Sequence, residues 1–427
     1  MNRSLRRADR PATPRVLVIV QNLHVPFDRR VWLECQSLVA AGYDVTVICP
    51  RGKTSKPFEV IDQVEIHTYP PYAPGGRAAG FVAEYAYSFL ATARLALRAR
   101  RRRGAFDVVQ ACNPPDVFWP LARWLRMRDG TRFVFDHHDL CPELYRSRFP
   151  DGARLPLRGL LALERATFHT ADRVTSTNAS YARIAVERGG KRPEDVTVVR
   201  TGPDAERLRR GPADPALRRG RRHLVAYLGV MGPQDGVDIV LAVADRIVNR
   251  MGRRDIAFTL MGAGDSYEGL VAQRDRLGLR DHVEMPGRVS DEVVAGVLST
   301  ADLGLCPDPH NPLNDVSTMN KTMEYMAFCL PVVAFDLRET RVSAQDAAVY
   351  VEPNRVDAYA KAILDLLEDP ERRAEMGRRG RQRVVEELAW THQRQGYVAV
   401  FDELTGRADA TAGEPGVRTG LETRTGA

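Results

Sequence analysis

The chain has 427 residues, of which 44% are hydrophobic and 27% charged, and its net charge is +7. This length exceeds what one hydrophobic core organises and the composition is globular, so we expect two domains of about 200 residues each. A membrane-spanning helix is excluded, because Glu84 and Arg94 interrupt the most apolar stretch before it reaches ~18 residues.

The N-terminus and the cysteines indicate a cytoplasmic protein. Residues 1–14 are basic without an apolar core, which predicts a disordered leader and not a signal peptide. The cysteines lie scattered in or beside apolar runs, without a CxxC pair, which is typical of small buried residues and predicts neither disulfides nor a metal site. They are Cys35, Cys49, Cys112, Cys141, Cys306 and Cys329.

Charge is distributed unevenly along the chain. Residues 1–200 hold 32 basic and 20 acidic side chains, whereas the remainder holds 30 and 35. The first half therefore has a net charge of +12 and the second half −5. A basic first half predicts an acidic partner or an anionic surface on that side of the molecule.

The first half alternates strand patterns with helical ones. Arg15–Val20 is a β-branched run, followed by a predicted helix at Val31–Ala41 that Gly42 ends and by a strand at Asp44–Cys49. Further helices are predicted near residues 81–100, 116–126, 158–170 and 180–188, and further strands near 107–110, 132–136, 173–177 and 196–200. Such repeats form a parallel sheet with helices on both faces, so residues 15–202 predict a Rossmann-like domain.

The second half repeats this organisation. Residues 203–222 are rich in Pro, Gly, Asp and Arg and predict an interdomain linker. Strand patterns at residues 223–228, 256–261, 282–285, 301–306 and 331–335 predict a second Rossmann-like domain over residues 223–388. Residues 389–405 are expected to form a C-terminal helix that closes the fold, and residues 406–427 a disordered tail. Two such domains should enclose a cleft at the C-terminal ends of their strands.

The stretch Pro307–Val333 carries the strongest functional pattern. Ser317 or Thr318 is positioned to cap a helix that carries Lys321 and Glu324 on adjacent turns. A strand that leads into a helix N-terminus offers unpaired backbone N–H groups to a phosphate. Only five of the 62 basic residues are lysines, so a lysine here indicates a need for a compact ammonium. A solvated Lys–Glu pair is the alternative.

Three further motifs lie at the ends of predicted strands. Asp136-His137-His138-Asp139 lacks the spacing of a metal site, so one histidine either hydrogen-bonds a substrate or is structural. The turn at residues 22–30 has no glycine to approach a pyrophosphate, and Arg29 and Arg30 either meet an acidic acceptor or solvate a helix end. Gly262-Ala263-Gly264-Asp265 is either a nucleotide contact or a tight turn.

A predicted helix over residues 79–103 combines apolar residues with a run of arginines. Phe81, Tyr85 and Leu90 precede Arg94, and residues 100–103 are all arginine. Such a helix either lies on an anionic membrane surface or packs its apolar stripe against its own sheet.

These segments together resemble glycosyltransferase family 4, the retaining, sugar-nucleotide-dependent enzymes of the GT-B fold. The likeness runs from about Arg15 to Leu404 and rests on NLHVPFDRRVWLECQSLVAAGYDVTVICP, FDHHDLCPE, VVRTGPD, LGVMGPQDGVD, LMGAGD, MPGRVSDEVV and NKTMEYMAFCLPVVAF. The resemblance implies an α/β fold of two facing Rossmann-like domains with an interdomain cleft. It also implies that the N-terminal domain binds the acceptor and the C-terminal domain the sugar nucleotide.

The resemblance also implies roles for individual residues. Glu324 matches the second glutamate of the E-x7-E motif, which binds the ribose hydroxyls, and Lys321 matches the lysine near the diphosphate. His138 matches the histidine beside the transferred sugar, and Asp139 is its catalytic partner in the motif. The other expected donor-binding residues are Gly229, Gly232, Gly264, Arg288 and Asp315, and the expected acceptor-binding residues are Asp28, Arg29 and Arg30.

Two departures from the family pattern affect the donor site. The first glutamate of E-x7-E falls at Val316, next to Asp315, and the Arg and Lys that clamp the diphosphate in many members fall at Val230 and Asp235. Phosphate binding is then expected to depend on Lys321, helix N-terminal amides and the arginines of the cleft.

We therefore predict a retaining transferase that moves a hexose-type sugar from a nucleotide-diphosphate sugar to a saccharide or lipid-linked acceptor, in polysaccharide or glycolipid biosynthesis. Its expected partners are the sugar nucleotide, this acceptor and an anionic membrane surface, without a metal, a separate cofactor or nucleic acid. Two alternatives stay open. A sugar-nucleotide epimerase would turn over donor without acceptor, and a non-catalytic sugar-nucleotide-binding subunit would transfer nothing.

Overall fold

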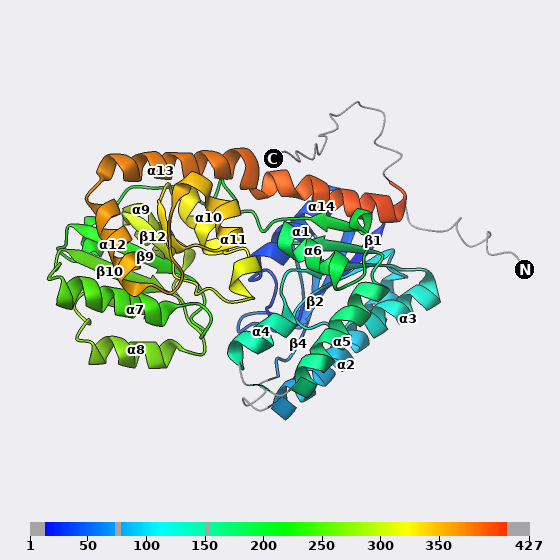
Figure 1. Cartoon of the computed structure of the whole chain (residues 1–427). Coiled ribbons are helices and arrows are strands. Elements are labelled where there is room, and N and C mark those ends of the chain that lie inside the picture. Colours follow the sequence, from blue (N-terminus) through cyan, green and yellow to red (C-terminus); the bar gives the residue numbers. More distant parts are fainter. Residues whose placement is uncertain (1–12, 73–77, 150–151, 153, 408–427) are drawn as a thin grey trace, which may run out of the picture.

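The computed structural model describes residues 13–72, 78–149, 152 and 154–407. Two parallel-sheet domains with helices on both faces lie side by side in an elongated molecule (Figure 1). The predicted α/β fold of two Rossmann-like domains is thereby confirmed. Most of the predicted leader and tail, residues 1–12 and 408–427, lies outside the described residues.

The N-terminal sheet has, within the described residues, eight strands in the order β3-β4-β2-β1-β5-β6-β7-β8. All neighbouring pairs are parallel except β3 and β4. The strands are β1 (Arg15–Ile19), β2 (Asp44–Pro50), β3 (Phe58–Ile61), β4 (Val64–Tyr69), β5 (Val108–Cys112), β6 (Arg132–His137), β7 (Arg173–Ser176) and β8 (Val196–Val198). The helices are α1 (Arg29–Ala40), α2 (Ala78–Arg103), α3 (Trp119–Asp129), α4 (Cys141–Arg148), α5 (Arg154–Thr170), α6 (Ala179–Glu187) and η2 (Pro193–Asp195).

The C-terminal sheet is parallel throughout, in the order β11-β10-β9-β12-β13-β14. Its strands are β9 (His223–Leu228), β10 (Ile256–Met261), β11 (Val283–Gly287), β12 (Leu303–Cys306), β13 (Val332–Phe335) and β14 (Ala348–Val351). The helices are α7 (Val237–Asp245), α8 (Tyr267–Arg276), α9 (Asp291–Thr300), α10 (Asn320–Ala327), α11 (Arg338–Ala344), α12 (Val356–Leu367) and α13 (Pro370–Arg383). Short helical turns are η3 (Pro215–Arg218), η4 (Arg246–Arg250), η5 (Asn314–Val316), η6 (Gln345–Ala347) and η7 (Val384–Leu388).

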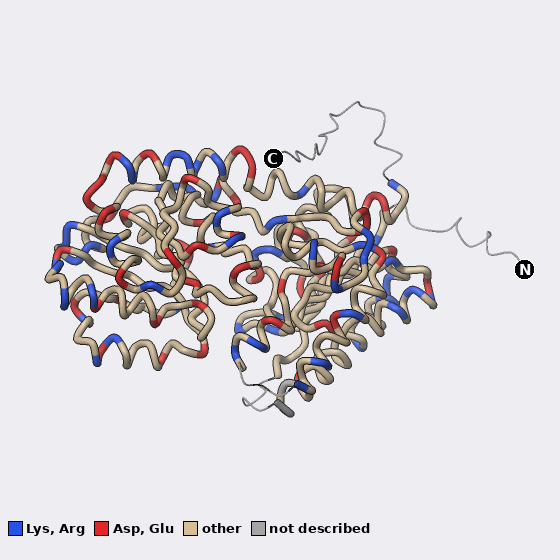
Figure 2. The backbone as a smooth tube through the Cα atoms, in the orientation of Figure 1, with Lys and Arg blue, Asp and Glu red and all other residues tan. Residues whose placement is uncertain are grey.

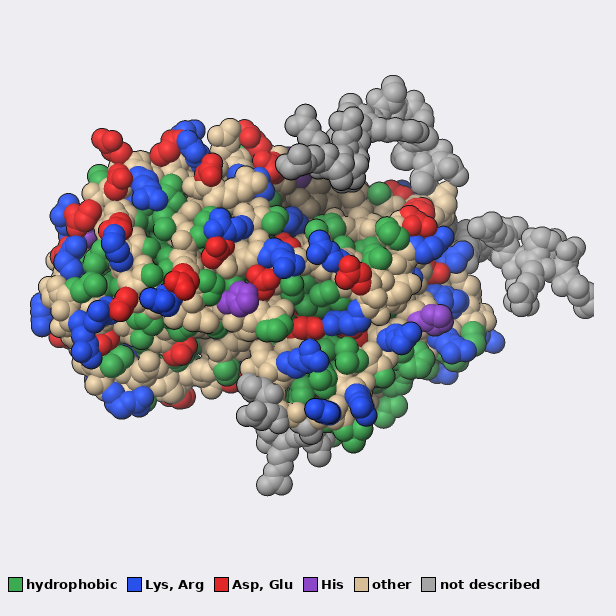
Figure 3. Space-filling model, in the orientation of Figure 1, with side chains coloured by type: hydrophobic (Ala, Val, Ile, Leu, Met, Phe, Trp, Pro, Cys, Tyr) green, Lys and Arg blue, Asp and Glu red, His purple; other side chains and the backbone are tan. Residues whose placement is uncertain are grey.

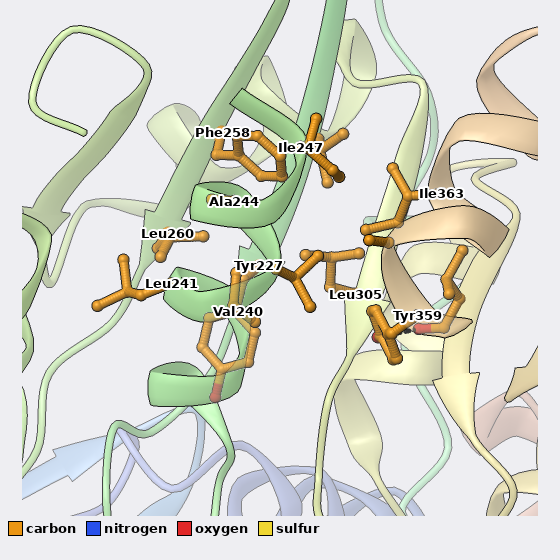
Figure 4. Packing of buried hydrophobic residues seen from close by; sticks show 14 of the residues in the cluster. Tyr227, Val240, Leu241, Ala244, Ile247, Phe258, Leu260, Leu305, Tyr359 and Ile363 are labelled. Atoms are coloured by element: carbon orange, nitrogen blue, oxygen red, sulfur yellow. Dashed lines mark hydrogen bonds between the residues drawn. The ribbon is translucent and has the colours of Figure 1, made fainter. Parts of the chain in front are cut away.

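The core of the C-terminal domain fixes the strand ends that face the cleft. Val240 and Ala244 of α7 lie against Tyr227 of β9 and Phe258 of β10 (Figure 4), and all four are fully buried. Burial of a large apolar side chain contributes about 1.5–3 kcal/mol. The loops that follow β9 and β10 are therefore held by a rigid support.

The C-terminal helix α14 (Trp390–Thr405) belongs to the core of the N-terminal domain. The chain leaves α13 through η7 and enters α14, which lies along the other domain (Figure 1). Trp390, Tyr397 and Phe401 are buried there, and the Tyr397 hydroxyl donates to Gln110 Oε1 at 2.7 Å. The segment from α13 to α14 and the linker at residues 203–222 thus both cross between the domains.

Several local features differ from the predictions. The antiparallel pair β3–β4, the helix α4 and the edge strand β14 were not predicted. Capping of α10 by Ser317 or Thr318 is wrong. The N-cap residue is Met319, which makes no side-chain capping bond. The two hydroxyls instead meet the N-terminal domain, because Ser317 Oγ lies 2.9 Å from the Tyr181 hydroxyl and Thr318 Oγ1 accepts from Asn178 Nδ2 at 3.0 Å.

Candidate active site

A cavity of about 300 Å³ lies between the two domains. This volume is at the lower end of the range for small-molecule sites. Its lining comes from the loops after β1, β6, β7 and β8 and from the start of α10, so it lies at the C-terminal strand ends where ligands of this architecture bind. The lining residues are Asp28, Arg30, His138, Asp139, Thr177, Tyr181, Thr201, Ser317, Thr318 and Asn320.

His138 contributes its ring to the wall of this cavity. Its Nδ1 lies 2.9 Å from Asp136 Oδ2, so Nε2 is the nitrogen that a ligand can reach. Burial lowers the pKa of His138, but the Asp136 carboxylate outweighs burial, and the pKa lies above its ordinary value of 6.5. The contact with Asp136 thus favours the protonated form of this ring more than in a free imidazole.

His137 lies in the core of the N-terminal domain. Its ring centroid is 5.5 Å from that of Phe135, 4.9 Å from Phe168 and 5.3 Å from Tyr181. Burial lowers the pKa of His137 to about 3, so the ring is neutral. Neither ring nitrogen has a hydrogen-bond partner among the described residues. His138, and not its neighbour, is thus the histidine of the cleft.

Asn113, which sequence analysis did not single out, holds the loop that carries these residues. Its Oδ1 accepts from the backbone N–H groups of His138 and Asp139 at 2.9 and 3.0 Å, and its Nδ2 donates to the Asp139 carbonyl at 2.7 Å. Burial raises the pKa of the Asp139 carboxyl. Asn113 directly follows β5, the neighbour of β6, and this position at an adjacent strand end is the signal that could have found it.

Arg30, predicted to bind the acceptor, forms hydrogen bonds and ion pairs with buried groups of the N-terminal domain. Its Nη2 donates to Asp136 Oδ1 at 2.7 Å, its Nε lies 3.0 Å from Glu34 Oε1, and its Nη1 donates to the Val199 carbonyl at 3.0 Å. Glu34 and Asp136 are fully buried and Arg30 is 6% exposed. Arg30 lines the cavity, and its role in acceptor binding stays a prediction.

The same carboxylates are close enough to form a cation site with a cysteine. Ligand atoms of Glu34, Cys112 and Asp136 lie within 4.8 Å of one another. The Arg30 guanidinium contacts both carboxylates, so this group already contains a cation. We therefore assign the group to the packing of the N-terminal domain and not to a metal.

The other two predicted acceptor residues lie at the start of α1. Asp28 Oδ1 accepts from the Val31 N–H at 3.2 Å and so caps the helix, and Asp28 also lines the cavity. Arg29 extends across the cleft, where it pairs with Asp291 and lies 3.5 Å from Glu324 Oε1. In this structure Arg29 therefore joins the two domains.

Lys321 lies inside the C-terminal domain, behind the cavity. Its side chain is 9% exposed and its Nζ donates to Asp308 Oδ1 at 2.7 Å. Burial lowers the pKa of the ammonium, but Asp308 outweighs burial and raises it well above its ordinary value. The structure thus pairs Lys321 within its own domain and does not bring it to the cavity wall with His138.

Glu324 lies one turn further along α10, with its side chain 22% exposed and facing Arg29. Burial raises the pKa of its carboxyl. Arg288, which follows β11, also reaches the first loop of the N-terminal domain, because its guanidinium lies over the Phe27 ring at 4.4 Å. Glu324 thus meets the start of α1, and Arg288 meets the loop that precedes it.

The predicted glycines lie in two loops that touch each other. A Cβ at Gly264 would lie 2.6 Å from the Met231 carbonyl oxygen, and one at Gly229 would lie 3.1 Å from Lys321 Cε. The Gly232 N–H donates to Asp235 Oδ2 at 2.9 Å. The glycines thus permit close packing of the loops after β9 and β10.

Asp315, also predicted to bind the donor, accepts from the Arg338 N–H at 3.0 Å at the start of α11. It does not line the cavity. Its role as a donor ligand stays a prediction.

Two family models match the chain on either side of the linker. The model described as Glycosyltransferase Family 4 matches residues 28–207, and the one described as Glycosyl transferases group 1 matches residues 222–369. The chain belongs to glycosyltransferase family 4. The matched ranges cover the loops that form the cavity, including His138 and the start of α10.

Individual curated proteins have only low sequence identity to this chain. The alpha-D-kanosaminyltransferase of Streptomyces kanamyceticus is 29% identical over 36% of this chain and 39% of its own length. The first curated relatives are matched over 39% to 65% of their length, so the chain spans about half of them.

Solved structures share the fold over nearly the whole chain. Sucrose-phosphate synthase from Thermosynechococcus elongatus has a TM-score of 0.75 at 16% identity and covers 92% of this chain and 100% of its own. Anabaena HepE in complex with UDP-glucose has a TM-score of 0.69 at 14% identity and covers 91% of this chain and 99% of its own.

Proposed function

We propose that the chain is a retaining glycosyltransferase that moves a hexose-type sugar from a nucleotide-diphosphate sugar to an acceptor held by the N-terminal domain. The observation that carries this proposal is the interdomain cavity, where His138 faces the start of α10. The first amides of a helix favour a diphosphate, and an imidazole opposite them can hydrogen-bond the sugar that is transferred. The UDP-glucose complex of HepE, a protein of the same fold, supports a donor of this class.

Retention is expected because the departing phosphate oxygen can take the acceptor proton on the face from which the sugar leaves. The protein then supplies positioning and charge stabilisation and needs no side-chain base. NMR of the anomeric proton during the first turnovers, compared with the donor, tests this part of the proposal.

Donor binding is expected to depend on Glu324. Glu324→Ala should weaken sugar-nucleotide binding about tenfold, the cost of hydrogen bonds to a charged group. A donor at a hundred times its Kd adds about 2.7 kcal/mol to stability, and in the variant the same concentration would add about half as much. Thermal shift and calorimetry with a panel of sugar nucleotides measure both effects.

The matched control for this experiment is Asp291→Ala. Asp291 is the other partner of Arg29 and its side chain is 54% exposed, so its loss should leave donor affinity unchanged. Equal nucleotide affinity in wild type and Glu324→Ala would contradict the assignment of Glu324.

One observation favours a second candidate, a non-catalytic subunit that binds the sugar nucleotide. Lys321 is neutralised by Asp308, and Val230 and Asp235 occupy the positions of the usual clamp residues. A subunit of this kind would be stabilised by donor but would transfer no sugar to any acceptor. An epimerase would instead convert the donor without an acceptor, so the same assays separate the three functions.

We further propose that the acceptor is lipid-linked and that α2 contacts an anionic membrane. No helix in the described part of the chain is long and apolar enough to cross a bilayer. Val82 and Leu90 are 70% and 67% exposed, and the same face continues with the exposed Arg94, Arg98 and Arg101. In Figure 3, hydrophobic and basic side chains are visible on the lower part of the N-terminal domain, where α5 and α2 lie one in front of the other in Figure 1.

Arg94→Gln/Arg98→Gln/Arg101→Gln is expected to release the protein from vesicles that contain anionic lipid, because each arginine near such a surface contributes about 1 kcal/mol. Arg100 and Arg103 are left unchanged, since they pair with Asp129 and Asp44 at 2.5 and 3.1 Å within the domain. Sedimentation with vesicles measures the effect, and added salt should reproduce it. If wild type does not sediment, α2 is only a packed helix.

A further inference from the structure

A second cavity, of about 380 Å³, lies in the C-terminal domain away from the interdomain cleft. Ala301 and Asp302 precede β12, and Leu330 and Pro331 precede β13, so this cavity lies at the N-terminal ends of the strands. The cleft residues lie at the opposite, C-terminal ends. We call this space the arginine cavity, because Arg210, Arg373, Arg378 and Arg381 line it.

The arginines come from the two segments that cross between the domains. Arg210 belongs to the linker, and the other three lie on α13, which runs along the top of the C-terminal domain before the chain enters α14 (Figure 1). This helix carries six arginines and two glutamates, and both kinds of charge can be followed along it in Figure 2. Arg381 joins the segments, because its Nη1 donates to the Leu208 and Ala327 carbonyls at 2.7 and 3.1 Å.

Three of these arginines are hydrogen-bonded to backbone and not to carboxylates. Arg210 Nε donates to the Ser299 carbonyl at 3.2 Å, and Arg373 Nη1 donates to the Leu366 carbonyl at 2.8 Å. Among the described residues, no carboxylate lies within ion-pair distance of Arg210, Arg373 or Arg381, whereas Arg378 pairs with Glu375 at 2.6 Å. The cavity therefore has an excess of positive charge.

Capping of helix ends explains only part of this arrangement. Ser299 and Leu366 lie in the last turns of α9 and α12, where a cation is favourable. In Arg210 and in Arg373, a single guanidinium nitrogen makes the bond to the helix-end carbonyl. Both Nη atoms of Arg210, and Nε and Nη2 of Arg373, have no hydrogen-bond partner among the described residues and are available to a ligand.

The Asp302 carboxylate in the cavity wall does not neutralise this excess. Arg218 Nη1 donates to Asp302 Oδ2 at 2.6 Å, and the Leu224 N–H donates to the same oxygen at 2.8 Å. Its charge is thus compensated from outside the cavity. Guanidinium groups with free donors are the preferred partners of phosphate oxygens in proteins.

We propose that the arginine cavity binds a small phosphate-bearing anion, either inorganic phosphate or a sugar phosphate. The ligand would bridge the linker and α13, and it would also touch the loop that follows α10, whose first residue Asn320 lines the cleft. Occupancy would therefore stiffen both connections between the domains. This site is separate from the sugar-nucleotide site and does not depend on the proposed transferase activity.

Cys329 provides a local reporter of binding. It lines the arginine cavity, and it is partly exposed, whereas the other five cysteines of the chain are buried. Alkylation of Cys329 by iodoacetamide, located by mass spectrometry, measures access to the cavity. Inorganic phosphate and glucose 1-phosphate are compared with sodium chloride at equal ionic strength. We expect each phosphate to slow alkylation several-fold at saturation, and chloride to have no such effect.

Variants locate the ligand. Arg210→Gln/Arg373→Gln should lower the affinity for the phosphate, measured by the concentration that protects Cys329. The expected decrease is about tenfold per arginine, the cost of a charge-assisted hydrogen bond. Arg372→Gln is the matched control, because Arg372 is exposed on the same helix and does not line the cavity. If the double variant does not fold, Arg210→Gln alone is used, since Arg210 is exposed in the linker.

Protection that is lost in the arginine variants and kept in Arg372→Gln supports the site. Absence of protection by both phosphates, or equal protection in the arginine variants and wild type, would overturn it.

Discussion

His138→Ala is expected to lower turnover about 100-fold and to leave nucleotide affinity nearly unchanged, the usual signature of a group that acts in the transition state. The ring lines the cavity and its Nδ1 is bonded to Asp136, which presents Nε2 to a ligand. Loss of the ring leaves no unpaired buried carboxylate, because Asp136 keeps Arg30 at 2.7 Å and Thr175 Oγ1 at 2.9 Å. Turnover assays, calorimetry and thermal melts of both proteins test this prediction.

His137→Leu is the control for this variant. Its ring lies among aromatic side chains without a hydrogen bond, so a side chain of similar volume should cost less than about 1.5 kcal/mol and leave turnover intact. His137→Ala, by contrast, should destabilise the protein by about 2 kcal/mol or more through the space it leaves. If His138→Ala keeps full turnover, or loses stability alone, the histidine of the cleft has only a structural role.

Local patterns in the sequence were sufficient to predict the fold. Each β-branched or apolar run between turn residues became a strand, as Arg15–Ile19 and His223–Leu228 show. The hairpin β3–β4 escaped prediction because its turn is Asp62-Gln63, both with positive φ, in place of the glycine that usually marks such turns. The start of α10 was misjudged because the hydroxyls of Ser317 and Thr318 bond to the other domain, which no local pattern reveals.

The candidate site depends on partners that are distant in the sequence. Asp136 lies 106 residues from Arg30, and Asp308 lies 13 residues before Lys321. From the sequence, both basic residues were expected to face a ligand. Glu34, four residues after Arg30, was a local signal that was not used, whereas nothing local indicates the pairing with Asp136 or Asp308. The loop of His138 was placed correctly at a strand end, since strand ends follow from the same periodicity that predicts the strands.

Arg30→Ala is expected to destabilise the protein by about 3–5 kcal/mol, because it removes the guanidinium that bonds the buried carboxyl groups of Asp136 and Glu34. Both are fully buried, and Arg30 Nε and Nη2 lie 3.0 and 2.7 Å from their oxygens. Burial and the neighbouring Asp136 raise the pKa of Glu34 to about 8 even beside Arg30, so at pH 7 the guanidinium mainly compensates the charge of Asp136. Chemical denaturation at pH 7 measures the loss, and Glu34→Gln in the same background should recover part of it.

The stability lost in Arg30→Ala should decrease as the pH is lowered. Without the guanidinium we expect raised pKa values for the two buried carboxyls, so the folded variant takes up protons that the unfolded state does not. Arg29→Ala is the matched control one residue away. Arg29 is 48% exposed and its partner Asp291 54% exposed, so this variant should cost no more than about 1 kcal/mol. If Arg30→Ala instead unfolds like the wild type and raises the KM for the acceptor, Arg30 would serve the acceptor, as the sequence analysis predicted.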